Sequence, residues 1–163
     1  MTKKRILTVK HDEKLRLVIE EVMVETEKEF EKTTKEVIAI GDSKIVELVD
    51  SELQNADDSA FVDLRLNEEY LLHNAIPTVI VMSNGQLVQV HAGNMVVSKY
   101  DSDTGKSGHL DDEDLKLFYT KYERAILPKH QTSMISARHR EVYGGPPADW
   151  AGKPVEVFVF IRN

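Results

Sequence analysis

The sequence predicts an α/β domain in which strands and helices alternate before a β-hairpin and a last helix, with a separate arm beyond them. Three observations support this prediction. Short β-type runs alternate with stretches whose apolar residues recur at helical spacing. The pair Asn84-Gly85 separates two apolar runs, as expected for a tight hairpin. Prolines and glycines become frequent beyond Pro128, which indicates a boundary near that residue.

The first half of the chain is expected to contain three strands, each followed by a helix. Apolar residues recur at intervals of three and four from Leu15 to Met23, and a similar pattern runs from Ile45 to Leu53. Both stretches are therefore predicted to be amphipathic helices. The expected strands are 5–9, 37–40 and 60–66, and the expected helices are 12–32, 43–53 and 67–73. This alternating order favours a parallel sheet covered by helices.

The second half is expected to add antiparallel strands to that sheet. Strands at 77–83 and 86–92 flank the hairpin turn. A polar stretch at 98–112 is expected to form a loop. The apolar positions of 112–126 predict a last helix, whose acidic start suits the positive end of the helix dipole. The resulting central sheet would be mixed.

This order of elements resembles the thioredoxin-like fold, and one segment resembles that family as a motif. Ile76-Pro77-Thr78, an apolar strand, Asn84-Gly85, a second strand and Gly93 are similar to the thioredoxin segment in which a cis-proline precedes the hairpin. The resemblance implies a βαβαβαββα domain with a central mixed sheet over residues 1–127. The composition of the remaining residues, 128–163, predicts a C-terminal arm that ends in a strand. The resemblance also implies a cis bond before Pro77.

The chain departs from that family at its reactive site, because it contains no cysteine. Thiol–disulfide exchange is therefore excluded, and the resemblance implies a redox-inactive member. The resemblance still implies the surface on which redox relatives bind extended peptides. The residues that would form this binding surface are Gly41, Asp42, Ser43, Ile76, Pro77 and Thr78.

The C-terminal arm contains the most β-prone run of the sequence. An apolar strand at the end of a chain has to pair with a sheet edge, because an unpaired one is an aggregation hazard. The edge belongs either to the same chain or to a neighbour, and the sequence leaves both open. The residues expected to act as the interaction arm are Trp150, Val155, Val157, Phe158, Val159, Phe160 and Ile161.

The charge distribution separates the arm from the body. The formal net charge is −7, made up of −9 over residues 1–126 and +2 over 127–163. This excess of acidic residues argues against nucleic acid as a partner, since phosphate binding relies on clustered lysine and arginine. No apolar run approaches the ~20 residues of a membrane-spanning helix, and no secretory segment is recognisable, so we expect a cytoplasmic protein.

Two enzyme-like patterns compete with this interpretation. The opening residues 4–13 resemble response-regulator receiver domains, with Asp63, Ser83 and Lys99 as phospho-acceptor, hydroxyl residue and lysine; Lys10 and His11, however, replace the acidic pair that would hold Mg²⁺. The run 37–43 resembles the first block of GDSL-type serine hydrolases, with Ser43 as nucleophile. The late Asp-x-x-His of that family is missing, since Asp149 is followed by Trp150, Ala151 and Gly152.

The sequence therefore predicts a non-catalytic protein-binding or assembly module, with a protein partner or self-association. The six histidines contain no pair at the spacing of a helical zinc site, so we expect neither a metal nor a cofactor. A degenerate receiver-type signalling domain is the first alternative, and a small Ser43-dependent hydrolase is the second.

Overall fold

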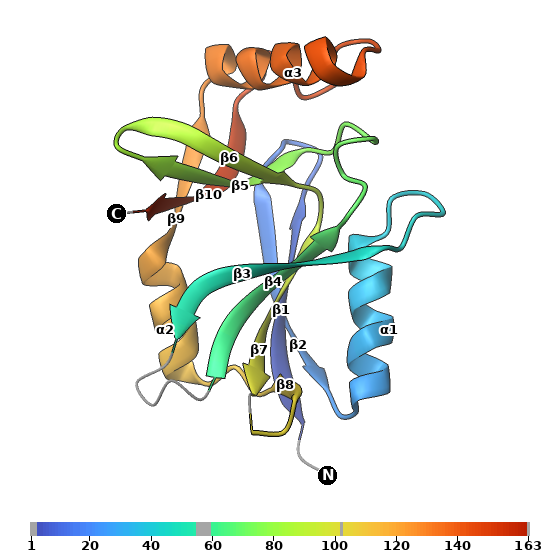
Figure 1. Ribbon diagram of the computed structural model, residues 1–163, viewed down its shortest axis with the longest axis vertical. Helices are drawn as coiled ribbons and strands as arrows, with labels where there is room; N and C mark the ends of the chain where they lie inside the picture. The colour runs from blue at the N-terminus through green and yellow to red at the C-terminus, as the bar shows by residue number, and fades with distance from the viewer. Residues whose placement is uncertain (1–2, 55–59, 102, 163) are drawn as a thin grey trace.

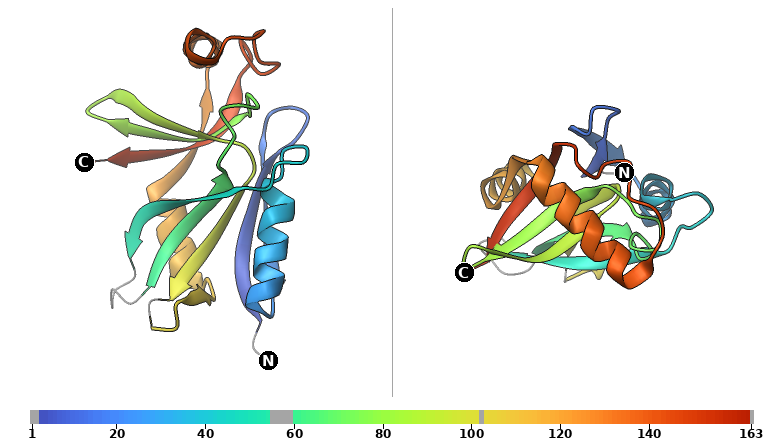
Figure 2. Two further views of the ribbon diagram at one scale, coloured as in Figure 1. Left: turned by 45° about the vertical axis from the view of Figure 1, so that its right-hand side comes forward. Right: turned by 90° about the horizontal axis from the view of Figure 1, so that it is seen from above.

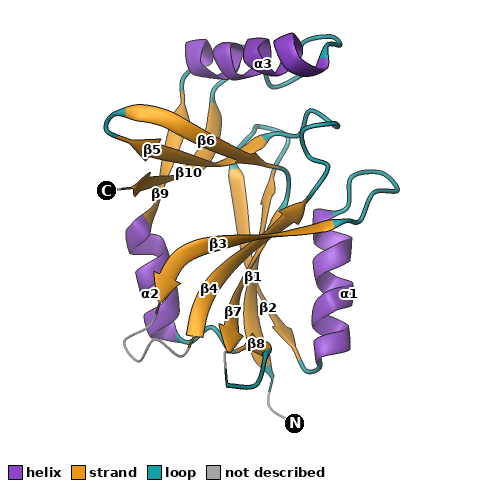
Figure 3. Ribbon diagram, in the orientation of Figure 1, coloured by secondary structure: helices purple, strands orange, loops and turns teal. Residues whose placement is uncertain are grey.

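The computed structural model describes residues 3–54, 60–101 and 103–162, of which 50–54, 60 and 61 are described by their backbone alone. Strands dominate this part of the chain (Figure 3). The strands are β1 (Lys4–His11), β2 (Leu17–Val24), β3 (Val46–Gln54), β4 (Ala60–Asn67), β5 (Pro77–Ser83), β6 (Gln86–Ala92), β7 (Met95–Asp101), β8 (Lys106–Gly108), β9 (Tyr122–Leu127) and β10 (Val155–Arg162). The helices are α1 (Glu27–Ile38), α2 (Asp112–Lys121) and α3 (Lys129–Tyr143).

The strands form two sheets. The larger has the order β2-β1-β7-β4-β3, with β8 paired to the end of β7, and every pairing in it is antiparallel. The smaller has the order β6-β5-β10-β9. It is mixed, because β10 runs parallel to β5 and antiparallel to β9. None of the helices in the described ranges is long and apolar enough to cross a membrane.

The sheets and helices are stacked so that each sheet is covered on both faces (Figures 1 and 2). α1 packs on one face of the large sheet, where Phe30 and Ile38 meet Ile6 and Val96. The other face packs against α2 and the small sheet. The residues of this central core are Leu7, Val9, Leu17, Val62, Leu64, Leu66, Val79, Met95, Val97, Leu110, Phe118, Tyr122 and Phe158. α3 lies across the far face of the small sheet, above a third cluster built around Trp150 and Val157.

The expected thioredoxin-like βαβαβαββα fold is wrong. The chain forms ten strands in two sheets and three helices over the described residues, and its only parallel pairing joins the last strand to β5. The expected cis bond before Pro77 is also wrong, since no described peptide bond is cis. Pro77 instead occupies the first position of β5, where a trans proline fits because it need not donate to the ladder.

Two stretches expected to be helices are strands. In Leu15–Met23 and Ile45–Leu53 the apolar residues include several β-branched side chains, which favour extended backbone. The Asp12 carboxylate accepts hydrogen bonds from the backbone N–H groups of Lys14 (2.8 Å) and Arg16 (3.0 Å), and this turn reverses the chain into β2. A complete hairpin ladder with β1 then stabilises β2, so strand pairing overrides the helical spacing.

Three further expectations differ at their boundaries. Residues 37–40 were expected to be a strand, but α1 extends through Ile38 and ends there. Asn67 is the last residue of β4, and residues 68–73 form turns instead of a short helix. The last helix ends at Lys121 because the following residues, Tyr122–Leu127, pair with β10 as β9. The polar stretch 98–112 contains the end of β7 and all of β8, and residue 102 lies outside the described residues.

Three sequence expectations are confirmed. Strands occur at 5–9 and 60–66, within β1 and β4. The Asn84-Gly85 turn joins β5 and β6 as an antiparallel hairpin, and both residues have positive φ (53° and 77°), as a tight hairpin turn requires. The acidic start of the last helix is a capping box, in which Asp111 and Asp114 each accept the other's backbone N–H.

Phe158 of β10 should be a main source of stability, because its ring is fully buried and contacts the Phe118 ring at 5.3 Å between centroids. Replacing it with alanine should lower the free energy of unfolding by about 3–5 kcal/mol, through lost burial and a cavity. Urea unfolding followed by Trp150 fluorescence measures this change.

Ile161 on the same strand is the matched control, because 63% of its surface is exposed. Ile161→Ala should change stability by no more than about 0.5 kcal/mol. Equal losses in the two variants would contradict the described packing of β10.

Candidate functional site

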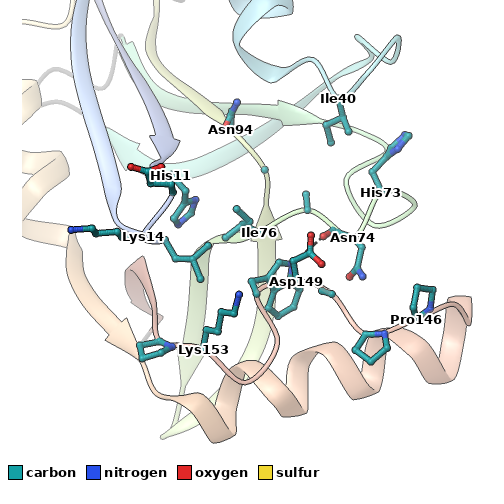
Figure 4. Close-up of a pocket in the computed structure, with 18 of the residues that line it drawn as sticks. His11, Lys14, Ile40, His73, Asn74, Ile76, Asn94, Pro146, Asp149 and Lys153 are labelled. Carbon is teal, nitrogen blue, oxygen red and sulfur yellow. Dashed lines mark hydrogen bonds between the residues drawn. The ribbon is translucent and has the colours of Figure 1, made fainter.

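A pocket of about 820 Å³ lies where the two sheets meet, and it is called the junction pocket here. Five segments form its wall: the turn between β1 and β2, the residues at the end of α1, the loop before β5, the turn between β6 and β7, and the segment between α3 and β10 (Figure 4). Its size is in the range of small-molecule sites. Its lining includes His11, Lys14, Leu15, Ile40, Asn74, Ile76, Asp149, Trp150 and Lys153.

His11 is fixed at the edge of this pocket by β10. Its Nε2 donates a hydrogen bond of 2.7 Å to the backbone carbonyl of Glu156, because a carbonyl can only accept. Nδ1 is therefore the unprotonated nitrogen of the neutral ring. Burial lowers the pKa of His11 below its usual value, although the nearby Glu156 and Asp12 oppose the shift. The ring is consequently neutral near pH 7 and offers a lone pair.

The hairpin that carries His11 is attached to β10 at two further points. The backbone N–H of Glu156 donates to the Leu15 carbonyl (2.9 Å), and the Glu156 carboxylate accepts the Leu17 N–H (2.8 Å). Arg124 of β9 also binds that carboxylate (2.9 Å). Hydrogen bonds and the Arg124 ion pair together lower the pKa of Glu156, against the effect of its burial. The pocket wall is thus held in place by paired strands.

Strained backbone is concentrated around the junction pocket. The non-glycine residues with positive φ in the described ranges are Leu15 (63°), Asn74 (54°) and Asn84 (53°). Asn84 belongs to the β5–β6 hairpin turn and Leu15 to the turn between β1 and β2, and Leu15 and Asn74 both line the pocket. A left-handed conformation is unfavourable for a branched apolar residue such as Leu15 and persists only where its surroundings enforce it. Such residues cluster at ligand sites, which makes the pocket a candidate site.

A second candidate is a groove between α3 and the edge strand β6, called the β6 groove here. It consists of three successive hollows of about 850, 220 and 230 Å³. The first and second hollows share Leu87 of β6, and the second and third share Val90 of β6. Ile135 and Arg138 of α3 line all three hollows. The two smaller hollows therefore lie along β6, whereas the largest also extends across β5, β10 and β9, and α3 is the opposite wall of all three.

The lining of the β6 groove is mostly apolar and contains no carboxylate among the described residues. This is unusual for a chain whose formal net charge is −7. Its cationic group is Arg138, which is exposed and has no ion pair within the described residues. The groove is thus an apolar channel with an unpaired positive charge along its wall.

α3 presents apolar residues to this groove because it attaches to the fold through small polar side chains. Thr132 and Ser136 are its buried residues. The Thr132 hydroxyl donates to the Lys153 carbonyl (2.9 Å) and accepts the Gly152 N–H (3.1 Å), while Ser136 Oγ accepts the Ala148 N–H (3.4 Å). Ile135 and the half-exposed Met134 are left facing the groove.

The predicted binding residues do not form one surface. Ile76 lines the junction pocket and Pro77 lines the end of the β6 groove, while Thr78 is buried and donates to the Gly93 carbonyl (2.5 Å). Gly41, Asp42 and Ser43 form the turn that follows α1 and line neither site.

The predicted interaction arm is largely built into the small sheet. Trp150, Val155, Val157 and Phe158 are buried, and Val159 and Phe160 are half-buried. β10 pairs in cis with β5 on one side and β9 on the other, which leaves Ile161 as the exposed apolar side chain of the group.

The residues of the two enzyme-like patterns lie apart. Lys99 shares a face of the large sheet with its cross-strand partner Val62, so Asp63 points to the other face. Lys99 pairs with Asp114 at 3.0 Å, and Ser83 belongs to the small sheet. The Ser43 hydroxyl has Glu69 (2.5 Å) and Asn67 (3.3 Å) as its partners, and neither is a histidine.

The sequence contained signals for both sites that the motif search missed. The sequence shows directly that the segment of β6, Gln86–Ala92, contains no Lys, Arg, Asp or Glu. Arg138 belongs to the basic C-terminal segment, but no pattern placed it beside β6. His11 is far in sequence from Asp149 and Lys153, so only the fold brings it to the same pocket. No cluster of three potential metal ligands occurs in the described ranges.

Comparison with known proteins gives no identification, since no protein-family model, curated protein or solved structure matches this chain. The resemblance to the thioredoxin-like family therefore has no support from relatives. Both candidate sites rest on the geometry described above.

The pH dependence of stability tests the state assigned to His11. In the unfolded chain a histidine binds a proton below about pH 6.5, whereas the lowered pKa delays protonation of His11 in the folded protein. Between these two pKa values the unfolded state binds more protons, so stability falls as the pH falls. His11→Gln keeps a donor for the Glu156 carbonyl and removes the titration.

Urea unfolding at about pH 7.5 and about pH 5.5 should show a smaller loss of stability in His11→Gln than in the parent. Part of the loss should remain, because burial and the nearby Arg162 also lower the pKa of His91. The exposed His130 is the control, and His130→Gln should lose as much stability as the parent. An unchanged loss in His11→Gln would contradict the neutral, buried state of His11.

Proposed function

We propose that this protein is a non-catalytic module that binds an extended segment of another protein chain along β6. The observation that carries the proposal is an uncharged edge strand that runs beside an apolar groove without carboxylates. In strand addition the main chain of the peptide pairs with the exposed sheet edge, and alternate side chains enter neighbouring pockets. The β6 groove offers both features side by side.

β6 differs from the other edge strands in how its edge is protected. Edge strands usually carry charges that discourage pairing with other chains. β2 contains Glu20 and Glu21, β3 contains Glu47, and β9 contains Glu123 and Arg124, whereas β6 contains none of the four charged residue types. Among the exposed residues of β6, the pairing with β5 shifts register once, at Val88. The Val88 side chain is 49% exposed. β6 is thus the edge most suited to accept a strand.

Charge indicates which kind of chain would bind. Arg138 lines every hollow of the groove without an ion pair, so a partner with an acidic side chain near the middle of its bound segment would complement it. Two copies of this protein joined through β6 would instead bring together two acid-free grooves and two chains of charge −7. A different protein therefore suits the groove better than a second copy.

The test uses a displayed library of random extended peptides, selected on the full chain. The selected peptides should alternate apolar and variable positions and should include Asp or Glu. Val88→Lys, which places a charge on the exposed edge, and Arg138→Glu, which reverses the groove charge, should each weaken binding by about tenfold or more. Fluorescence anisotropy of a labelled peptide measures the change.

Leu48→Lys is the matched control, because Leu48 is 58% exposed on β3, an edge strand of the other sheet. It should bind the peptide as the parent does. Failure of the library to give binders, or binders that tolerate Val88→Lys, would argue against strand addition at β6. A dimer in light scattering that Val88→Lys dissociates would show that a second copy occupies this edge instead.

A further inference from the structure

The junction pocket, which shares Asn74, Ala75 and Trp150 with the adjoining end of the β6 groove, contains charged groups for which the described residues supply no partner. The Lys153 side chain extends into the pocket from below and the Asp149 carboxylate faces it from the loop after α3 (Figure 4). Within the described residues neither side chain forms an ion pair or a hydrogen bond. A positive and a negative charge are thus available to a ligand in the same pocket.

His11 adds a hydrogen-bond acceptor on the third side of the pocket. Its ring points into the pocket from the end of β1, whereas the neighbouring Lys14 extends away from it (Figure 4). The bond from Nε2 to the Glu156 carbonyl leaves Nδ1 as the free acceptor. A carboxylate and an imidazole acceptor suit a donor group such as an ammonium, while the Lys153 amine suits a carboxylate.

Apolar side chains form much of the remaining wall, beside Glu13, His73 and Asn94. Leu15, Ile40 and Ile76 face the pocket together with Trp150, which is fixed by a hydrogen bond from its Nε1 to the Asn74 carbonyl (3.0 Å). Leu15 holds a left-handed backbone that is unfavourable for its side chain, so the wall keeps its shape at a cost in backbone energy. Apolar walls with a few polar groups of defined direction are the usual composition of a small-molecule site.

We propose that the junction pocket binds a small zwitterion with apolar side chains, namely a free amino acid or a short peptide. The ligand ammonium lies between the Asp149 carboxylate and His11 Nδ1, its carboxylate pairs with Lys153, and its side chains contact Leu15, Ile76 and Trp150. A ligand with one charge would leave either Asp149 or Lys153 unpaired in a partly desolvated pocket, which is unfavourable. The volume of about 820 Å³ accommodates more than one residue.

Isothermal titration calorimetry on the full chain tests this with matched probes. Leucine and leucyl-leucine carry both charges and differ in size, so their relative affinities distinguish a free amino acid from a peptide. N-acetyl-leucyl-leucine lacks the ammonium, and leucyl-leucine amide lacks the carboxylate. Each blocked peptide should bind at least about tenfold more weakly than leucyl-leucine, because it leaves one protein charge without a partner.

Variants assign each charge to its residue. Asp149→Asn should weaken the binding of leucyl-leucine but leave the already weak binding of N-acetyl-leucyl-leucine unchanged. Lys153→Met should also weaken the binding of leucyl-leucine, but it should leave the already weak binding of leucyl-leucine amide unchanged. All the substituted side chains are exposed, so the fold should survive, and thermal unfolding checks this. Lys14→Met is the matched control and should leave every affinity unchanged.

Three results would overturn the proposal. The first is the absence of binding by both leucine and leucyl-leucine at millimolar concentration. The second is equal binding of the blocked and unblocked peptides, which would mean that the charges are not recognised. The third is equal weakening by Lys14→Met and Lys153→Met, which would indicate a general effect of surface charge.

Discussion

The pairing of β10 between β5 and β9 is the interaction on which the rest of this structure depends. It joins a segment from the end of the chain to the hairpin in the middle, in parallel with β5 and antiparallel to β9. One face of β10 then contributes Phe158 to the central core, and the other contributes Val157 to the cluster beneath α3. Because β10 also accepts the hydrogen bond from His11, both candidate sites require this one strand.

Local turn chemistry could be predicted from the sequence, but long-range pairing could not. Asn84-Gly85 defines a hairpin by its own backbone preference, and the capping box at Asp111 and Asp114 stabilises a helix start within four residues. In contrast, Leu15–Met23 has helical spacing and β-branched composition at once. Its hydrogen-bonded ladder with β1 decides between these tendencies, and that ladder depends on the turn at Asp12. The thioredoxin-like order failed because it required this stretch to be a helix.

The candidate sites were harder to predict than the fold for a related reason. A motif search finds residues that lie close together in sequence, such as Gly41-Asp42-Ser43, whereas each site here collects single residues from distant segments. His11 and Lys153 are brought together by the β1–β2 hairpin and the segment before β10. The absence of charge in β6 was visible in the sequence, but its meaning depends on β6 being an edge strand. Only the strand order supplies that information.

The separation of charge along the chain has a structural counterpart. The acidic body forms the large sheet, α1 and α2 together with β5, β6 and most of β9, and the basic segment 127–163 forms α3, the loop after it and β10. Arg138 and Lys153, the cations of the two proposed sites, both belong to this segment, and within the described part of the chain neither forms an ion pair with a carboxylate of the body. If these cations served only to offset the net negative charge, ion pairs with the acidic strands would be the expected arrangement. Their position beside an apolar groove and in an apolar pocket instead favours a role in recognising anionic groups of bound molecules.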